Sequence, residues 1–136
     1  MAKPRQKVFL IEDELDIMYV YKTALKAAGI DVEGLSTGKE AMEKLKEVQA
    51  KKAEKPWLVL LDLVLPDING LEILRAIREH PVTKDTLVFI LSNYTSDALY
   101  NLQYVKPDRC ILKAGITPTQ LASLVTEAMK KSNASS

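Results

Sequence analysis

Short apolar runs alternate with longer segments of helical period along the whole chain. Four runs without internal polar alternation, at residues 8–11, 58–61, 87–91 and 110–112, predict strands that are covered on both faces. Residues 31–35 form a weaker candidate strand. The order of these runs predicts five strands separated by connections long enough to hold helices.

Apolar residues recur at helical spacing between the runs and predict five helices. They cover residues 15–28, 37–48, 71–77, 96–104 and 118–131. Gly29 is placed to end the first helix, and Ser36 or Thr37 to begin the second. Thr117 and Gln120 have the spacing of a reciprocal cap at the start of the last helix.

Strands and helices in strict alternation imply parallel crossover connections and a three-layer α/β domain. The chain has 136 residues, which fits one domain. We expect this domain to span residues 1–131 and to be followed by a disordered tail at residues 132–136.

Composition limits the classes of partner. The chain has 19 basic and 18 acidic residues and a net charge of +1, so the sequence predicts no direct nucleic-acid partner and no membrane partner. No apolar run approaches the roughly 20 residues that span a bilayer, and no signal peptide is evident. The lone cysteine, Cys110, suits a reducing cytoplasm and has the character of a small buried apolar residue.

Polar side chains follow four of the predicted strands. Glu12 and Asp13 follow the first strand, Asp62 the third, Ser92 the fourth and Lys113 the fifth. In an open parallel sheet, ligands bind at the carboxyl ends of the strands, where these side chains can converge.

Three carboxylates at one edge repel each other, by about 4 kcal/mol for a pair at ~4 Å and an effective dielectric constant near 20. A hard cation such as Mg²⁺ relieves this repulsion, and Lys113 can offset further charge and contact a phosphate. Aspartate is a competent nucleophile for phosphoryl transfer, which mostly needs positioning and charge neutralisation. The strand ends therefore predict a magnesium-dependent phosphoryl-transfer site.

Four segments together resemble the bacterial response regulator receiver family of two-component signalling. Residues 8–14 resemble its first strand and acidic pair, and residues 60–70 its phosphoacceptor segment. Residues 89–93 resemble the strand that ends in Ser or Thr, and residues 111–113 the segment that ends in lysine. Each segment is a weak signal alone, whereas four in this order are a strong one.

The resemblance implies a flavodoxin-like fold with strand order 2-1-3-4-5. It implies that Asp62 is the phosphoacceptor and that Ser92 and Lys113 hold the phosphoryl group. It also implies the Mg²⁺ ligands, which are Asp13, Asp62, Glu12 directly or through water, and the backbone carbonyl of Val64.

The sequence departs from the family at two positions. Ala114 follows Lys113, where the family usually has proline, and Cys110 occupies the position of an aromatic switch residue. Tyr94 and Tyr104 are the candidate substitutes for that ring. Val64 and Tyr94 lie two residues beyond Asp62 and Ser92, where the family controls water access, and they predict slow self-dephosphorylation.

The function that the resemblance implies is a phosphorylation switch. A histidine kinase or histidine phosphotransfer protein would donate the group, and an unknown downstream protein would read it by protein–protein contact. The face formed by residues 96–104, 110–112 and 118–131 would suit a homodimer. We expect no enzymatic turnover beyond self-phosphorylation and self-dephosphorylation. The alternative is a receiver-like scaffold that binds partners without phosphorylation.

Overall fold

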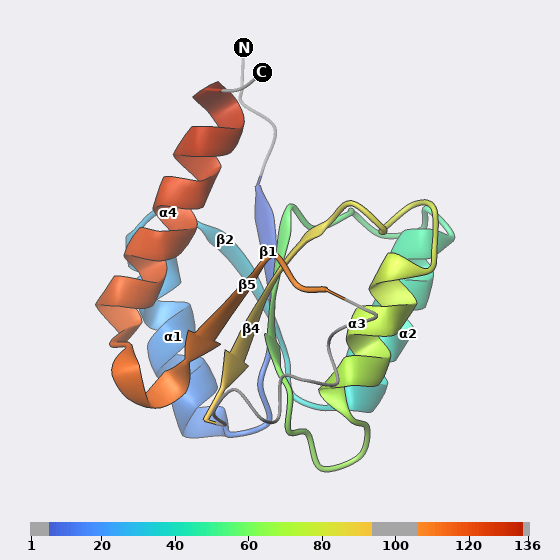
Figure 1. The fold of residues 1–136 in the computed structure, drawn as a ribbon, viewed down its shortest axis with the longest axis horizontal. Coiled ribbons are helices and arrows are strands. Elements are labelled where there is room, and N and C mark those ends of the chain that lie inside the picture. Colours follow the sequence, from blue (N-terminus) through green and yellow to red (C-terminus); the bar gives the residue numbers. More distant parts are fainter. Residues whose placement is uncertain (1–5, 94–105, 135–136) are drawn as a thin grey trace.

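Five parallel strands form a single sheet in the order β2-β1-β3-β4-β5 (Figure 1). The computed structural model describes residues 6–93 and 106–134, with the side chains of residues 132–134 excepted. The strands are β1 (Lys7–Ile11), β2 (Asp31–Leu35), β3 (Leu58–Asp62), β4 (Leu87–Ser92) and β5 (Arg109–Leu112). The predicted α/β class, the parallel sheet and the flavodoxin-like strand order are confirmed.

Helices cover both faces of the sheet. Their bounds are α1 (Leu15–Ala27), α2 (Gly38–Gln49), α3 (Gly70–Arg78) and α4 (Pro118–Ala134), and a 3₁₀ turn, η2 (Lys113–Gly115), follows β5. Figure 1 shows α1 and α4 on one face and α2 and α3 on the other. The helix that the sequence predicts at residues 96–104 lies outside the described residues.

Each face of the sheet has its own apolar core, because the side chains of a strand point alternately to opposite faces. On β3, Val59 and Leu61 belong to the core beneath α2 and α3, and Leu58 and Leu60 to the core beneath α1 and α4. All residues of β3 are buried, and burying each such aliphatic side chain stabilises the fold by roughly 1.5–3 kcal/mol. The sheet is therefore a rigid platform for whatever lies at its strand ends.

The predicted helix caps are confirmed. The amide of Glu40 donates to Oγ1 of Thr37 over 3.0 Å at the start of α2. At the start of α4, the amide of Gln120 donates to Oγ1 of Thr117 over 3.1 Å, and the Thr117 amide donates to Oε1 of Gln120 over 2.9 Å. Gly29 ends α1 with a φ of 83°, a left-handed conformation that favours glycine.

Two local predictions are corrected. Cys110 is exposed, not buried, because β5 is an edge strand in which Ile111 is the only buried residue. Helix α4 continues to Ala134, into the segment predicted as a tail from residue 132, because no helix-breaking residue follows Lys131.

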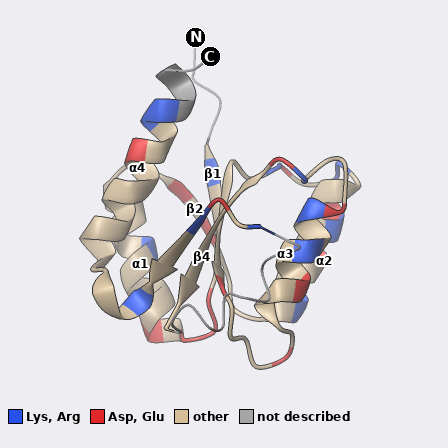
Figure 2. Cartoon of the chain, in the orientation of Figure 1, with Lys and Arg blue, Asp and Glu red and all other residues tan. Residues whose placement is uncertain are grey.

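Charged residues of both signs lie on helices, loops and strands, and the two signs are interleaved on the helices (Figure 2). Among the helices that the structure describes, none combines the length and the apolar character needed to cross a bilayer.

Candidate functional site

The register of the sheet brings the polar residues of four strand ends together. Ile11 pairs with Leu61, so Glu12 and Asp62, which follow these two residues, lie at the same level of neighbouring strands. Asp62 pairs with Leu91, one residue before Ser92. Ser92 pairs with Leu112, one residue before Lys113. The convergence predicted for this edge of the sheet is thus a direct result of the parallel pairing.

One ammonium group joins two buried carboxylates. The Nζ of Lys113 lies 2.8 Å from Oε2 of Glu12 and 2.9 Å from Oδ2 of Asp62. The side chain of Glu12 is 0% exposed, and those of Lys113 and Asp62 are below 10%. Ion pairs this deeply buried are weakly screened by salt, so the two acids and the lysine act as one electrostatic unit.

The acidic residues fit a divalent cation. Glu12, Asp13 and Asp62 each offer a carboxylate oxygen, and these oxygens all lie within 4.8 Å of one another. Within the described part of the chain, the buried Oε1 of Glu12 has no hydrogen-bond partner. Because an unpaired buried carboxylate oxygen is costly, a hard cation with oxygen ligands would satisfy it. The donor set suits Mg²⁺, as the sequence predicts.

The surroundings raise the pKa of two groups in the cluster. Burial raises the pKa of Glu12 to about 7; the hydrogen bond from Lys113 opposes this rise and the charge of Asp62 adds to it. For Lys113, burial alone would lower the pKa, but its hydrogen bonds to Glu12 and Asp62 outweigh burial and raise it. Lys113 therefore stays charged at neutral pH, whereas both the protonated and the ionised form of Glu12 are populated there.

The β3–α3 loop presents its backbone to the phosphoacceptor candidate. The amide of Val64 donates to Oδ1 of Asp62 over 3.0 Å, and the amide of Gly70 donates to the carbonyl of Leu63 over 2.9 Å. A Cβ on Gly70 would lie 2.6 Å from the carbonyl oxygen of Asp62, so only glycine fits there. The Val64 carbonyl as a metal ligand stays a prediction.

Ser92 is buried at the end of β4, beside the strand that carries Asp62. The turn after Lys113 is a 3₁₀ turn through Ala114 and Gly115, and no described peptide bond is cis. Tyr94 lies outside the described residues.

Tyr21 is a neighbour of the site that the sequence did not single out. It is buried on α1, and its hydroxyl pKa is raised, first by burial and then by the charges of Glu12 and Asp62 against that of Lys113. The sequence shows Tyr21 only as one apolar position of an amphipathic helix, so no signal in it marks proximity to the acids.

A parallel 2-1-3-4-5 sheet with buried acids and a lysine at its carboxyl edge defines a flavodoxin-like domain of the signalling-receiver class. The family model described as response regulator receiver domain matches residues 8–125. The chain therefore belongs to the response regulator receiver domain family, whose general function is a phosphorylation switch in two-component systems.

Curated relatives carry the same domain within longer proteins. The chain is similar to the transcriptional regulatory protein TrcR of Mycobacterium tuberculosis, at 36% identity over 96 residues, which cover 71% of this chain and 35% of TrcR. It is also similar to the alkaline phosphatase synthesis transcriptional regulatory protein PhoP of Bacillus subtilis, at 24% identity, covering 93% of this chain and 50% of PhoP. The chain thus spans a third to a half of the length of these relatives.

Solved structures agree over almost the whole chain. The phosphorylated cyanobacterial phytochrome response regulator RcpA superposes with a TM-score of 0.77 at 29% identity, covering 92% of this chain and 91% of RcpA. The receiver domain of a LuxO-type repressor from Vibrio parahaemolyticus has a TM-score of 0.77 at 25% identity, covering 97% and 95% of the two chains.

Proposed function

We propose that this receiver domain accepts a phosphoryl group on Asp62 from a histidine kinase or a histidine phosphotransfer protein, with Mg²⁺ bound at Glu12, Asp13 and Asp62. One observation carries the proposal: Asp62 ends a buried strand in hydrogen-bond contact with Lys113 and within 4.8 Å of two other carboxylates. A domain that only docks partners gains nothing from this costly charge cluster.

The proposed chemistry is a displacement at phosphorus. A carboxylate oxygen of Asp62 attacks, a P–O bond forms, and the P–N bond of the phosphohistidine breaks with its electron pair leaving on the imidazole nitrogen. The Nζ of Lys113 lies 2.9 Å from Oδ2 of Asp62 and would donate a hydrogen bond to a phosphoryl oxygen after the transfer. The Ser92 hydroxyl would donate to another phosphoryl oxygen. Mg²⁺, when bound, neutralises charge on the carboxylates and on the transferred group.

Exposed apolar side chains in the segments at or after the strand ends support a protein as the phosphodonor. Leu15 and Tyr19 on the first turns of α1 are 68% and 74% exposed, and Val64 and Leu112, which flank Asp62 and Lys113 in sequence, are also exposed. Exposed apolar groups beside a polar site are typical of protein-binding surfaces. A small-molecule phosphodonor would not need these exposed apolar side chains for binding.

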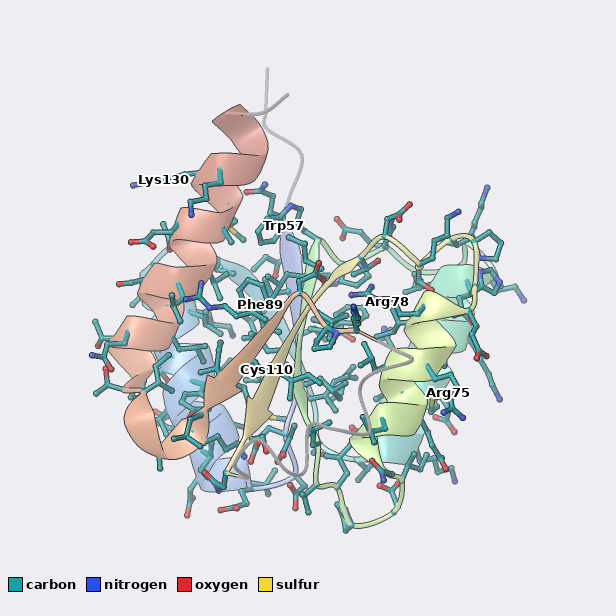
Figure 3. The ribbon with its side chains drawn as sticks, viewed as in Figure 1. Trp57, Arg75, Arg78, Phe89, Cys110 and Lys130 are labelled. Atoms are coloured by element: carbon teal, nitrogen blue, oxygen red, sulfur yellow. The ribbon has the colours of Figure 1, made fainter. Side chains whose placement is uncertain are left out.

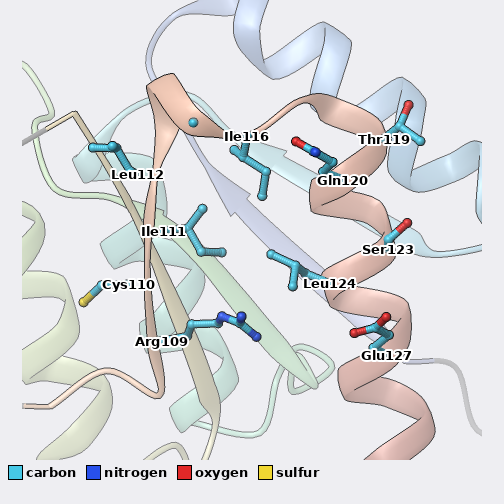
Figure 4. A pocket seen from close by; sticks show the side chains of 11 residues that line it. Arg109, Cys110, Ile111, Leu112, Ile116, Thr119, Gln120, Ser123, Leu124 and Glu127 are labelled. Carbon is cyan, nitrogen blue, oxygen red and sulfur yellow. The ribbon is translucent and has the colours of Figure 1, made fainter.

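The output surface is proposed at β5 and α4. A groove of about 520 Å³ lies between them, with Leu112, Ile116 and Leu124 as apolar walls and Arg109 and Glu127 as charged ones (Figure 4). We place the contact with the unknown downstream protein here, and a homodimer would use the same face. The third predicted part of this face, residues 96–104, lies outside the described residues. Sedimentation of the phosphorylated and unphosphorylated protein tests the dimer.

The remaining expectations are part of the same proposal. Asp62 would catalyse only its own phosphorylation and dephosphorylation, because Val64 occupies the position where aspartate-nucleophile phosphatases generally have a second acid. The near-balanced charge supports a protein without a direct nucleic-acid or membrane partner, and the lone Cys110 suits a reducing cytoplasm.

Mass spectrometry tests the proposed function. The protein is incubated with Mg²⁺ and acetyl phosphate beside the Asp62→Asn variant, and the intact masses are recorded. We expect one phosphoryl group on the wild type and none on the variant. A wild type that binds Mg²⁺ but gains no mass would instead support the alternative, a scaffold that is not phosphorylated. The family-atypical residues Cys110 and Ala114 favour that alternative.

A further inference from the structure

The carboxylate of Asp67 caps a helix that is remote in sequence. Its Oδ1 accepts a hydrogen bond from the amide of Gly38 and its Oδ2 one from the amide of Lys39, both over 2.9 Å. Gly38 and Lys39 are the first two residues of α2, and Asp67 belongs to the loop between β3 and α3. Two hydrogen bonds from one side chain thus connect this loop to α2.

Close packing accompanies these hydrogen bonds. A Cβ on Gly38 would lie 2.8 Å from the Cβ of Ile68 and 2.9 Å from Oδ1 of Asp67. Ile68 packs against the core beneath α2 and α3. The start of α2 therefore lies so close to the loop that only glycine fits at position 38.

The same loop supplies the backbone group that touches Asp62. Its base is closed by the isolated antiparallel bridge between Val64 and Asn69, and Val64 donates its amide to Oδ1 of Asp62 over 3.0 Å. Asp67 lies between the two bridge residues, at the tip of the loop. The base is thus held by its neighbours in sequence, whereas Asp67 holds the tip against α2.

We propose that Asp67 is a positioning residue that, by binding the first two amides of α2, orders the β3–α3 loop and so holds the peptide group of Val64 at Asp62. This inference deepens the proposed function, on which its relevance to phosphorylation rests. It means that α2 and the phosphoacceptor site are mechanically linked, so a partner that moves the start of α2 changes the geometry at Asp62.

The charge of Asp67 is consistent with this role. The hydrogen bonds from the amides of Lys39 and Gly38 hold the pKa of Asp67 below its usual range, so the group is ionised at neutral pH. A negative charge at a helix N-terminus also interacts favourably with the helix dipole. Both oxygens are therefore available as acceptors under ordinary conditions.

Amide hydrogen exchange in the Mg²⁺-free protein provides the direct test. We expect Asp67→Ala to speed exchange of the Val64 amide by about tenfold, the size expected for loss of one hydrogen bond. Thr37→Ala is the matched control, because it removes the bond from Thr37 to Glu40 in the same helix turn and leaves the Asp67 contacts in place. Exchange at Val64 should be unchanged in this control.

A second variant and a second readout complete the test. Asp67→Asn keeps one acceptor oxygen for two amides, so its Val64 exchange rate should lie between those of the wild type and Asp67→Ala. This variant replaces Asp67→Ala in the test if Asp67→Ala does not fold. We expect the Mg²⁺ dissociation constant, measured by calorimetry, to rise severalfold in Asp67→Ala and not in Thr37→Ala. Equal effects of the two alanine variants, or an unprotected Val64 amide in the wild type, would overturn the inference.

The exchange measurement separates this inference from the proposed function. If the wild type gains no phosphoryl group but Val64 exchange responds to Asp67 and not to Thr37, the proposed function fails and the positioning role stands. If phosphorylation occurs and Val64 exchange does not respond to Asp67→Ala, the proposed function stands and the positioning role fails.

Discussion

Lys113 donates a hydrogen bond of 2.8 Å to Glu12, a residue 101 positions earlier in the chain. Neither side chain has appreciable contact with solvent. The ammonium group of Lys113 also reaches Asp62, so it holds together carboxylates at the ends of two different strands. The stability of the site and its chemistry therefore depend on the same three groups.

Removal of the lysine should destabilise the fold. Lys113→Met leaves Glu12 and Asp62 buried without this counter-charge, and we expect the free energy of unfolding to fall by about 3 kcal/mol. Urea denaturation measures the loss, with Lys130→Met, an exposed residue of α4, as the control. Mg²⁺ should restore more stability to Lys113→Met than to the wild type, and an equal response would contradict this account.

The raised pKa of Glu12 predicts a pH dependence of stability without Mg²⁺. Its ordinary pKa is 4.5 and its pKa in the folded protein is about 7, so protonation favours the folded state. The stabilisation is fully present below pH 4.5 and is lost as the pH rises through 7. Between pH 5 and 8 the wild type should lose about 2 kcal/mol relative to Glu12→Gln, which does not titrate.

Unfolding of both proteins at several pH values checks this prediction, and a constant difference between them would refute it. Since Mg²⁺ competes with the proton on Glu12, Mg²⁺ affinity should rise with pH up to about 7 and then level off.

Two glycines near the site should differ in how strongly substitution by alanine affects stability. In Gly70→Ala the new Cβ would meet backbone atoms of Asp62 and Leu63 at 2.6 and 2.7 Å, which cannot yield cheaply. We expect a loss of about 2 kcal/mol and weaker Mg²⁺ binding. In Gly115→Ala the nearest atom is 3.9 Å away, on Leu112, and we expect almost no change. Thermal unfolding measures the stability of both variants, and Mg²⁺ titration measures their affinity for the cation.

Arg78 should contribute far more to stability than Arg75. The Arg78 guanidinium donates to the carbonyls of Lys106, Lys84 and Thr86 and to Oδ2 of Asp108. It is 20% exposed, whereas Arg75 is 61% exposed and pairs with Glu79 at 4.0 Å. Figure 3 shows Arg78 directed toward the sheet and Arg75 on the outer side of α3.

We expect Arg78→Ala to lower the free energy of unfolding by about 2–3 kcal/mol and Arg75→Ala by at most about 0.5 kcal/mol. Chemical denaturation measures both. Similar losses in the two variants would show that the hydrogen bonds of Arg78 add little.

Val64 should slow the loss of phosphate from Asp62, provided that phosphorylation occurs as proposed. Its side chain is apolar, exposed and two residues from Asp62, so it offers no hydrogen bond to orient a water molecule at phosphorus. Val64→Asn adds such a group and should shorten the lifetime of the aspartyl phosphate, as followed by intact mass after removal of the donor. Fast loss in the wild type that Val64→Asn leaves unchanged would refute this prediction.

Much of the site could be predicted because its residues follow buried strands directly. Glu12, Asp62, Ser92 and Lys113 stand at the strand ends, and parallel pairing brings such positions to one edge. Asp67 could not be predicted in this way, since 29 residues separate it from Gly38 and neither residue belongs to a periodic pattern. The exposure of Cys110 was missed because an apolar run does not reveal whether its strand lies at a sheet edge.

The sequence by itself determined the order of the described strands and helices, the helix caps at Thr37 and Thr117, and the candidate acids and lysine. These features depend on local periodicity and on residues a few positions apart. The tertiary structure decided that Lys113 bridges Glu12 and Asp62, that burial raises the pKa of Glu12, and that Asp67 caps α2. Distances and desolvation arise only when remote segments pack together, so local sequence patterns do not contain them.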